Sequence, residues 1–172
     1  MRLSNMMNLR RIASSPSRLL LLLIFVIIAI FFNSFSDEKV IVGKVVKVID
    51  GDTIEILDKN NKNYRVRFFG MDAPESKQAY GKKSREFLAS MIASKTVTAI
   101  QKDKDKYSRI VAIIKLDDED INKKMVANGY AWAYTYYSDI YAMDMRLARE
   151  QKLGLWADKN PIEPYEWRKM NR

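Results

Sequence analysis

Residues 40–57 read VIVGKVVKVIDGDTIEIL, and this stretch decides the fold. β-Branched residues dominate its first ten positions, which is typical of a strand. Asp50-Gly51 then supplies the residue types that tight turns favour, and a second short apolar run follows at 53–57. The pattern predicts a β-hairpin with the Asp-Gly pair between its two strands.

The segments after this hairpin continue the β pattern. A polar turn precedes an expected third strand at 64–71, in which Arg65 and Arg67 lie on one face. Two more strands are expected at 96–102 and 109–116. Five short strands with a helix after the third favour a Greek-key barrel of the OB type, because a closed barrel leaves no open sheet edge. The predicted fold class is α+β, a five-stranded OB-type barrel with three helices.

The three helices follow from the spacing of apolar residues. Helical spacing marks 81–93, and 121–128 is expected to be a short helix with Gly129 at its C-terminal cap. Ser138 is placed to cap a final helix. That helix is expected to bury one face, formed by Ile140, Met143, Leu147 and Ala148.

A hydrophobic N-terminal segment precedes the domain. Residues 19–32 form an unbroken apolar run that follows four arginines, Arg2, Arg10, Arg11 and Arg18. A run this short is typical of a signal peptide, and Ser34-Phe35-Ser36 offers a small-x-small cleavage pattern. The charge-free window up to Ser36 also reaches the lower limit for a membrane-spanning helix. Residues 1–36 are therefore predicted to be either a signal peptide or a membrane anchor.

The position of the arginines also predicts a location for the rest of the chain. Basic residues before the apolar run favour a cytoplasmic N-terminus, so residues 37–172 are expected to be exported, and to be membrane-anchored or secreted or periplasmic. Their length suits one domain, which we expect to be monomeric. From about residue 157 the chain is expected to form a tail.

The composition excludes several classes of enzyme. The chain has no cysteine and no histidine, which removes thiol nucleophiles, His-ligated zinc and every mechanism with a histidine base. Any metal must be a hard cation held by oxygen atoms. The net charge is +9, and without the four N-terminal arginines it is +5, a mild bias that is compatible with a polyanionic partner but does not require one.

Three clusters of residues carry the chemistry. They are Asp50-Gly51-Asp52-Thr53, the stretch 67–75 (RFFGMDAPE) and Asp105-Lys106-Tyr107-Ser108-Arg109. Taken singly, each has an ordinary explanation as a turn, a helix start or a solvated ion pair. Together they offer two aspartates and a main-chain carbonyl for one divalent cation, a glutamate to activate water, and two guanidiniums to grip a phosphate. This combination favours attack of water on a phosphodiester.

The order and spacing of the three clusters resemble the signature of the staphylococcal nuclease (thermonuclease) family. The likeness extends from Val40 to about Trp156. It implies an OB-type barrel with three helices that cleaves DNA and RNA endonucleolytically. It also implies that the bond between phosphorus and the 5′ oxygen breaks, which leaves 3′-phosphate ends.

The resemblance further implies a calcium site. Asp52 and Asp72 would be calcium ligands, with the main-chain carbonyl of Ala73 as a third. Ala73 stands where the best-known member of the family has Thr, a change of little consequence if only the carbonyl is a ligand.

The resemblance assigns the catalytic groups as well. Glu75 would be the general base or would orient the water, and Arg67 and Arg109 would hold the phosphate. Ser108 stands where the family usually has Gly before the second arginine. If this residue needs a positive φ, the strain costs on the order of 1 kcal/mol.

Four residues are expected to contact the substrate. Tyr107 and Lys106 lie inside the third motif, and Tyr134 and Tyr137 could stack on bases, although packing explains Tyr134 equally well. The stretch 161–168 (PIEPYEWR) resembles the tail of bacterial family members and is expected to pack against the domain without a catalytic role.

The sequence therefore predicts an exported calcium-dependent endonuclease with DNA and RNA as substrates, and with the membrane as a further partner if the N-terminal segment is retained. The alternative is a catalytically inactive OB-type module that binds nucleic acid at the cell envelope. A third possibility is an envelope interaction protein that uses the barrel only as a scaffold. The complete set of acids and arginines favours the enzyme.

Overall fold

The computed structural model describes residues 16–33 and 38–171 of the chain. They belong to two units that divide between Glu38 and Lys39. This division lies next to the boundary predicted at residue 37.

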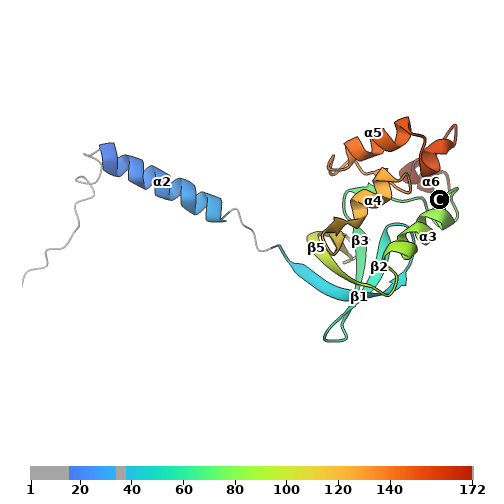
Figure 1. Cartoon of the computed structure of the whole chain (residues 1–172), viewed down its shortest axis with the longest axis horizontal. Helices are drawn as coiled ribbons and strands as arrows, with labels where there is room; N and C mark the ends of the chain where they lie inside the picture. Colours follow the sequence, from blue (N-terminus) through green and yellow to red (C-terminus); the bar gives the residue numbers. More distant parts are fainter. Residues whose placement is uncertain (1–15, 34–37, 172) are drawn as a thin grey trace, which may run out of the picture. The chain divides into compact units, whose positions relative to one another are not determined.

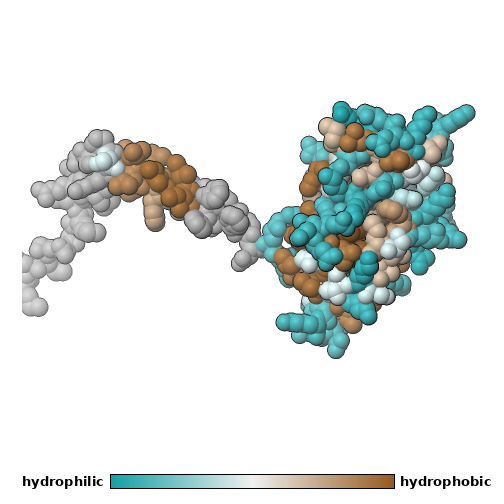
Figure 2. Space-filling view, viewed as in Figure 1, coloured by the Kyte–Doolittle hydropathy of each residue, from teal (hydrophilic) through white to brown (hydrophobic). Residues whose placement is uncertain are grey.

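The first unit contains helix α2 (Pro16–Asn33), whose side chains from Leu19 to Ile28 are apolar and exposed. The hydrophobic colour of this helix is visible in Figure 2. Over residues 16–33 and 38–171, no helix combines the length and apolarity needed to cross a membrane, so the expectation of a transmembrane helix is not met there. The cleavage pattern at 34–36 lies outside the described residues.

The second unit is built on a closed β-barrel (Figure 1). Its five strands are β1 (Val40–Val48), β2 (Thr53–Asp58), β3 (Asn63–Phe68), β5 (Thr96–Lys104) and β6 (Ile110–Leu116). They lie in the order β3-β2-β1-β5-β6, and parallel pairing between β3 and β6 closes the sheet. A short strand, β7 (Glu119–Asp120), pairs with the end of β6. The prediction of a five-stranded barrel of the OB type is confirmed.

Strand β1 shows how the sequence closes the barrel. Ile41 and Val45 alternate with exposed residues and point into the core. A β-bulge between Val45 and Lys47 then shifts the pairing with β2, which bends the strand as a barrel wall requires. At Gly43 a side chain would lie 2.7 Å from the carbonyl oxygen of Leu57, so only glycine allows the two strands to approach this closely.

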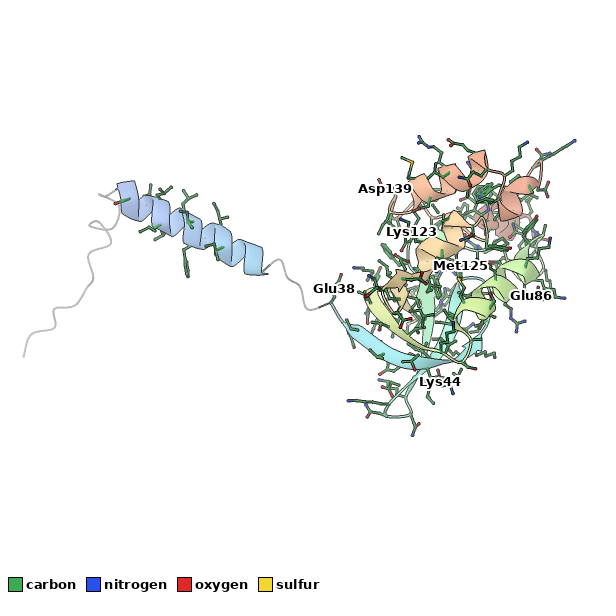
Figure 3. All side chains as sticks on the ribbon, viewed as in Figure 1. Glu38, Lys44, Glu86, Lys123, Met125 and Asp139 are labelled. Atoms are coloured by element: carbon green, nitrogen blue, oxygen red, sulfur yellow. The ribbon has the colours of Figure 1, made fainter. Side chains whose placement is uncertain are left out.

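The helices gather at one end of the barrel. They are α3 (Gly81–Ile92), α4 (Ile121–Ala127), α5 (Ala142–Glu150) and α6 (Pro164–Met170), with a 3₁₀ turn, η1 (Gly154–Ala157). Figure 1 shows α4, α5 and α6 together at this end. Met125 of α4, labelled in Figure 3, is fully buried and belongs to the main hydrophobic core. The sequence predicted three helices for the domain, and α6 is an addition.

The third predicted strand, 64–71, is shorter than expected. β3 ends at Phe68, and Gly70 turns the chain with a φ of 72°. Met71 and Asp72 then form the separate short strand β4 (Met71–Asp72), which pairs with β8 (Trp132–Ala133). The turn matters because it places Asp72 on a second small sheet beside the barrel.

The buried face predicted for the final helix is wrong at three of its four positions. Ala148 is 1% exposed, but Ile140, Met143 and Leu147 are 50%, 56% and 43% exposed. The helix instead packs with Tyr141, Met145 and Ala148. The rotation has a polar cause, because the buried hydroxyl of Tyr141 donates to Oδ2 of Asp120 at 2.9 Å.

The start of this helix also differs from the prediction. Ser138 is not its cap, because α5 begins at Ala142 and Tyr141 occupies the N-cap position. Asp120 itself caps α4, since its side chain accepts the amide of Lys123.

The chain just before the predicted tail packs on the domain, and within the tail the carbonyl of Ile162 accepts Nε2 of Gln78 at 2.7 Å. Trp156 meets Trp132 edge to face at 4.4 Å, and Arg149 of α5 lies over both rings. The amide of Leu155 donates to the carbonyl of Gly129 at 2.8 Å. These contacts fix the chain just before it continues to α6.

Candidate active site

Two aspartates meet at one guanidinium nitrogen. Nη2 of Arg67 lies 3.1 Å from Oδ2 of Asp52 and 2.7 Å from Oδ1 of Asp72. Asp52 directly precedes β2, Arg67 is on β3 and Asp72 is on β4, so three short segments converge here. The side chains of Asp52 and Asp72 are 5% and 1% exposed, so both carboxylates are almost fully desolvated.

The turn before β2 holds Asp52 in place. Its Oδ1 accepts the hydroxyl of Thr53, and its Oδ2 accepts the amide of Ala73 at 3.1 Å. Its own amide donates to Oδ1 of Asp50. A side chain at Gly51 would clash with Ser84 of α3, so glycine lets this turn lie against the helix.

Burial and mutual repulsion shape the acidity of this cluster. Burial, together with the charge of Asp52, raises the pKa of Asp50 to about 7. Burial also raises the pKa of Asp72, with a further contribution from Asp52, although the hydrogen bonds from Arg168 and the charge of Arg67 oppose the rise. The charge of Asp52 raises the pKa of Arg67, so this guanidinium stays charged. A cluster with this excess of acid favours a bound cation.

Ala73 and Glu75 follow Asp72 directly and lie at the same site. Ala73 is buried and donates its amide to Asp52. The side chain of Glu75 is 34% exposed, which leaves it accessible to solvent at the edge of the buried pair. A short turn fixes its backbone, because the Glu75 amide donates to Oε1 of Gln78 and the Gln78 amide donates to the Glu75 carbonyl.

Arg168 of α6 also belongs to this site. Its Nη1 donates to Oδ1 of Asp72 at 3.1 Å and to Oε1 of Glu75 at 2.8 Å, and its Nη2 donates to Oδ2 of Asp72 at 2.8 Å. The sequence placed this residue in a tail without a catalytic role. The only signal in the sequence was a conspicuous run of aromatic, proline and basic residues, which does not indicate which side chain reaches the site.

Arg109 is held by an acid four residues before it. Its Nε donates to Oδ2 of Asp105 at 2.6 Å, and Oδ1 of Asp105 accepts the amides of Tyr107 and Arg109. Partial burial alone would raise the pKa of Asp105. The hydrogen bonds from Arg109 and Tyr107 outweigh burial and hold this pKa below its ordinary value. Asp105 therefore orients the guanidinium, a role that the sequence did not assign to it.

Ser108 has a φ of 60°, in the left-handed region that favours glycine. The positive φ considered in the sequence analysis is therefore present. Despite this strain the turn is complete, because the Ser108 amide donates to the carbonyl of Asp105.

Of the two predicted phosphate-binding arginines, Arg67 is on β3 and Arg109 directly precedes the neighbouring strand β6. β3 and β6 are parallel, and Val66 pairs with Ile110, so Arg109 is level with Arg65. Val66 and Ile110 are buried, which directs the residues on either side of them outward. A surface depression of about 440 Å³ lies beside Arg109 and is lined by Arg65 and Tyr107 among others. This depression extends the basic surface away from the aspartates.

The predicted substrate contacts form two groups. Tyr107 is 68% exposed, and both Lys106 and Arg109 lie over its ring, at 5.1 and 5.5 Å. Tyr134 and Tyr137 are 5.3 Å apart between ring centres. The proximity of Asp72 contributes to a raised pKa of Tyr134, after burial, so the second group adjoins the acidic cluster.

The tyrosine group also contains Tyr136 and Tyr165. The ring centre of Tyr136 lies 5.7 Å from that of Tyr134 and 5.8 Å from that of Tyr165 in α6. Tyr136 and Tyr137 are 69% and 79% exposed. Exposed rings of this kind offer stacking surfaces beside the cluster.

The donor set suits a hard divalent cation. Among the described residues no group of three or more acidic side chains is arranged to hold a metal ion. The predicted ligand set contains only two acidic side chains, Asp52 and Asp72, and its third ligand is a main-chain carbonyl. Asp52 and Asp72 already share a single cationic nitrogen, so their oxygens face a common point, as carboxylates around calcium do. The chemistry and placement of these two carboxylates therefore fit such an ion.

Comparison with known proteins shows the family to which this chain belongs. Residues 65–158 match the family model described as staphylococcal nuclease homologue. The chain is 42% identical over 154 residues to an uncharacterized endonuclease of Haemophilus influenzae. The matched region covers 88% of this chain and 84% of that protein. The chain is also 38% identical over 144 residues to the micrococcal nuclease of Shigella flexneri, which covers 76% and 82% of the two chains. The predicted enzyme class, a hydrolase of the nuclease type, is confirmed, and the chain belongs to the staphylococcal nuclease family.

Proposed function

We propose that this chain is an exported, calcium-dependent endonuclease that hydrolyses DNA and RNA and leaves 3′-phosphate ends. The observation that carries the proposal is the meeting of Asp52 and Asp72 at Nη2 of Arg67, with Glu75 at the edge of the same cluster. Relatives named as endonuclease and micrococcal nuclease support the substrate class. The arginines before the apolar run support export.

Asp52, Asp72 and the carbonyl of Ala73 would hold calcium. When bound, calcium would supply positive charge beside the phosphate oxygens and would help to activate water. The two carboxylates are almost fully desolvated, and a cation bound there would replace part of the positive charge that Arg67 and Arg168 supply to them.

Glu75 would take the proton from the attacking water. Its side chain is the most exposed of the three acids, so a water molecule can reach it. Its backbone is fixed by Gln78, which limits its motion relative to Asp72. Both properties suit a general base.

Arg67 and Arg109 would bind the phosphate from the barrel side. Arg67 is 23% exposed and is aligned by two aspartates, and Arg109 is 22% exposed and is aligned by Asp105. Guanidiniums that are aligned in advance stabilise the charge that grows on the phosphoryl oxygens in the transition state.

A plasmid-digestion assay tests the proposal. The full chain should degrade plasmid DNA and RNA with calcium and should stop when a chelator is added. Tight binding of nucleic acid without cleavage across several divalent ions would instead favour the inactive module. Because phosphate contacts dominate affinity, substrate binding should weaken steeply with salt in either case.

Export has its own test. A reporter fused after Arg172 should be found outside the cytoplasmic membrane, and recovery of the full-length fusion from the cytoplasm would contradict export. N-terminal sequencing of the exported chain would show whether cleavage occurs after Ser36.

A further inference from the structure

We propose that Arg168 is a positioning residue of the active site, which holds Glu75 against Asp72 in the metal-free protein and competes with calcium for Asp72. The inference rests on the proposed calcium site. It concerns α6, which lies beyond the residues matched by the family model.

The contacts of Arg168 cover both oxygens of Asp72. Oδ1 receives Nη1 of Arg168 and Nη2 of Arg67, and Oδ2 receives Nη2 of Arg168 at 2.8 Å. These N–H groups take three of the roughly four lone-pair positions of the carboxylate, so a cation that binds Asp72 lies next to the positive charge of Arg168. Calcium and Arg168 therefore compete for this carboxylate.

The charges of the cluster favour the same conclusion. Asp52, Asp72 and Glu75 bring three negative charges, and Arg67 and Arg168 bring two positive charges. Arg168 thus supplies cationic charge where calcium is expected to supply it. Asp72 is 1% exposed, so it would be a costly buried anion if Arg168 were absent and nothing replaced it.

Contacts other than those of Arg168 hold α6 and the residues just before it. The side chain of Arg168 is 30% exposed. Nε2 of Gln78 donates to the carbonyl of Ile162 at 2.7 Å, and the ring of Tyr165 lies 5.8 Å from that of Tyr136. A change at Arg168 should therefore alter the cluster while α6 stays in place.

The contact with Glu75 gives Arg168 its second role. Nη1 is shared between Oδ1 of Asp72 and Oε1 of Glu75, so one nitrogen sets the separation of the two carboxylates. When calcium takes an oxygen of Asp72, the 2.8 Å contact with Glu75 can persist. Arg168 would then keep the base beside the metal site.

The test is calcium binding by isothermal titration calorimetry, on the full chain in mild detergent and without nucleic acid. Arg168→Met should bind calcium about tenfold more tightly than the wild type, within the usual range of coupling between two ligands of one site. Arg168→Lys, which keeps a charge but not the two-pronged contact, should fall between them. The control is Lys169→Met on the same helix, since Lys169 pairs with Glu166 and is half-exposed. Its calcium affinity should equal that of the wild type.

The outcomes separate this inference from the calcium site itself. Equal or weaker calcium binding by Arg168→Met than by a wild type that binds calcium would overturn the competition and leave the calcium site standing. Absence of binding in every variant would overturn both. If Arg168→Met does not fold without metal, Arg168→Lys decides the question, and unchanged affinity in that variant counts against the proposal.

Discussion

Both terminal nitrogens of Arg168 donate to the carboxylate of Asp72, across 96 residues of sequence, at 3.1 and 2.8 Å. This pair joins the C-terminal helix α6 to the short strand β4. The candidate active site therefore contains more of the chain than the three sequence motifs cover. The same pair brings α6, which follows the barrel and the three predicted helices, back to the acidic cluster.

Glu75→Gln should lower the maximal cleavage rate by about a hundredfold or more, because the amide keeps the shape of the side chain but cannot accept a proton from water. Calcium affinity should change little, since Glu75 is not among the proposed ligands. Steady-state kinetics at several calcium concentrations separate the two effects. Glu86→Gln on α3, at an exposed glutamate, is the matched control and should behave as the wild type.

Asp72→Asn should chiefly weaken calcium binding. We expect a loss of about tenfold or more, because removal of a charged ligand costs more than removal of a group outside the coordination shell. The calcium concentration that gives half-maximal activity is the measurement. Asp118→Asn changes an exposed acid in the turn between β6 and β7 and should leave that concentration unchanged. An equal effect of the two substitutions would argue against a metal site at Asp72.

Arg109→Ala should reduce the rate by about a hundredfold, the scale of losing one aligned donor to the transition state. Arg109→Lys should restore little of it, because an ammonium cannot reproduce a planar two-pronged contact. Arg146→Ala on α5 removes an exposed arginine and is the control. Substantial rescue by lysine would mean that Arg109 contributes only charge.

Asp105→Asn should make the free energy of unfolding depend less on pH in the acidic range. The folded pKa of Asp105 is lowered, so its stabilising contribution is present above the unfolded value of 3.8 and is lost as the pH falls through the folded value. The difference in unfolding free energy between the wild type and Asp105→Asn should be constant near neutral pH and should shrink below about pH 4. Urea unfolding at a series of pH values measures it. A difference that grows toward acid pH would have the wrong sign.

Ser108→Gly should stabilise the folded chain by up to about 1 kcal/mol, because serine pays for a positive φ that glycine adopts freely. The measurement is urea unfolding in the presence of chelator. Ser90→Gly, within α3, is the opposite control and should destabilise, since glycine is a poor helix former. Destabilisation by both substitutions would show that the Ser108 side chain contributes more than its backbone strain removes.

The sequence predicted the barrel well because strand patterns and turn residues act locally. The β-branched residues of β1 and the Asp50-Gly51 turn lie within a few residues of one another. Part of the candidate site could be predicted for the same reason, since Arg67, Asp72 and Glu75 lie within one short motif. The structure then shows that Asp52, from the turn before β2, lies 3.1 Å from Nη2 of Arg67.

The parts that could not be predicted depend on long-range contacts. The face of α5 was misjudged because a buried hydrogen bond between Tyr141 and Asp120 sets its rotation, which apolar spacing alone does not reveal. Arg168 was missed because nothing near it in the sequence indicates its partner, which lies on β4. In both cases a polar pair between distant elements decides the arrangement.

The most direct measurement of the central claim is single-turnover cleavage of labelled single-stranded DNA and RNA oligonucleotides by the full chain, with identification of the product ends. We predict cleavage that requires calcium, with 3′-phosphate ends on both substrates and no cleavage by the double variant Asp52→Asn and Asp72→Asn. Cleavage that persists in this variant at the wild-type rate, or oligonucleotides that are bound but remain intact at saturating calcium, would contradict the proposed active site.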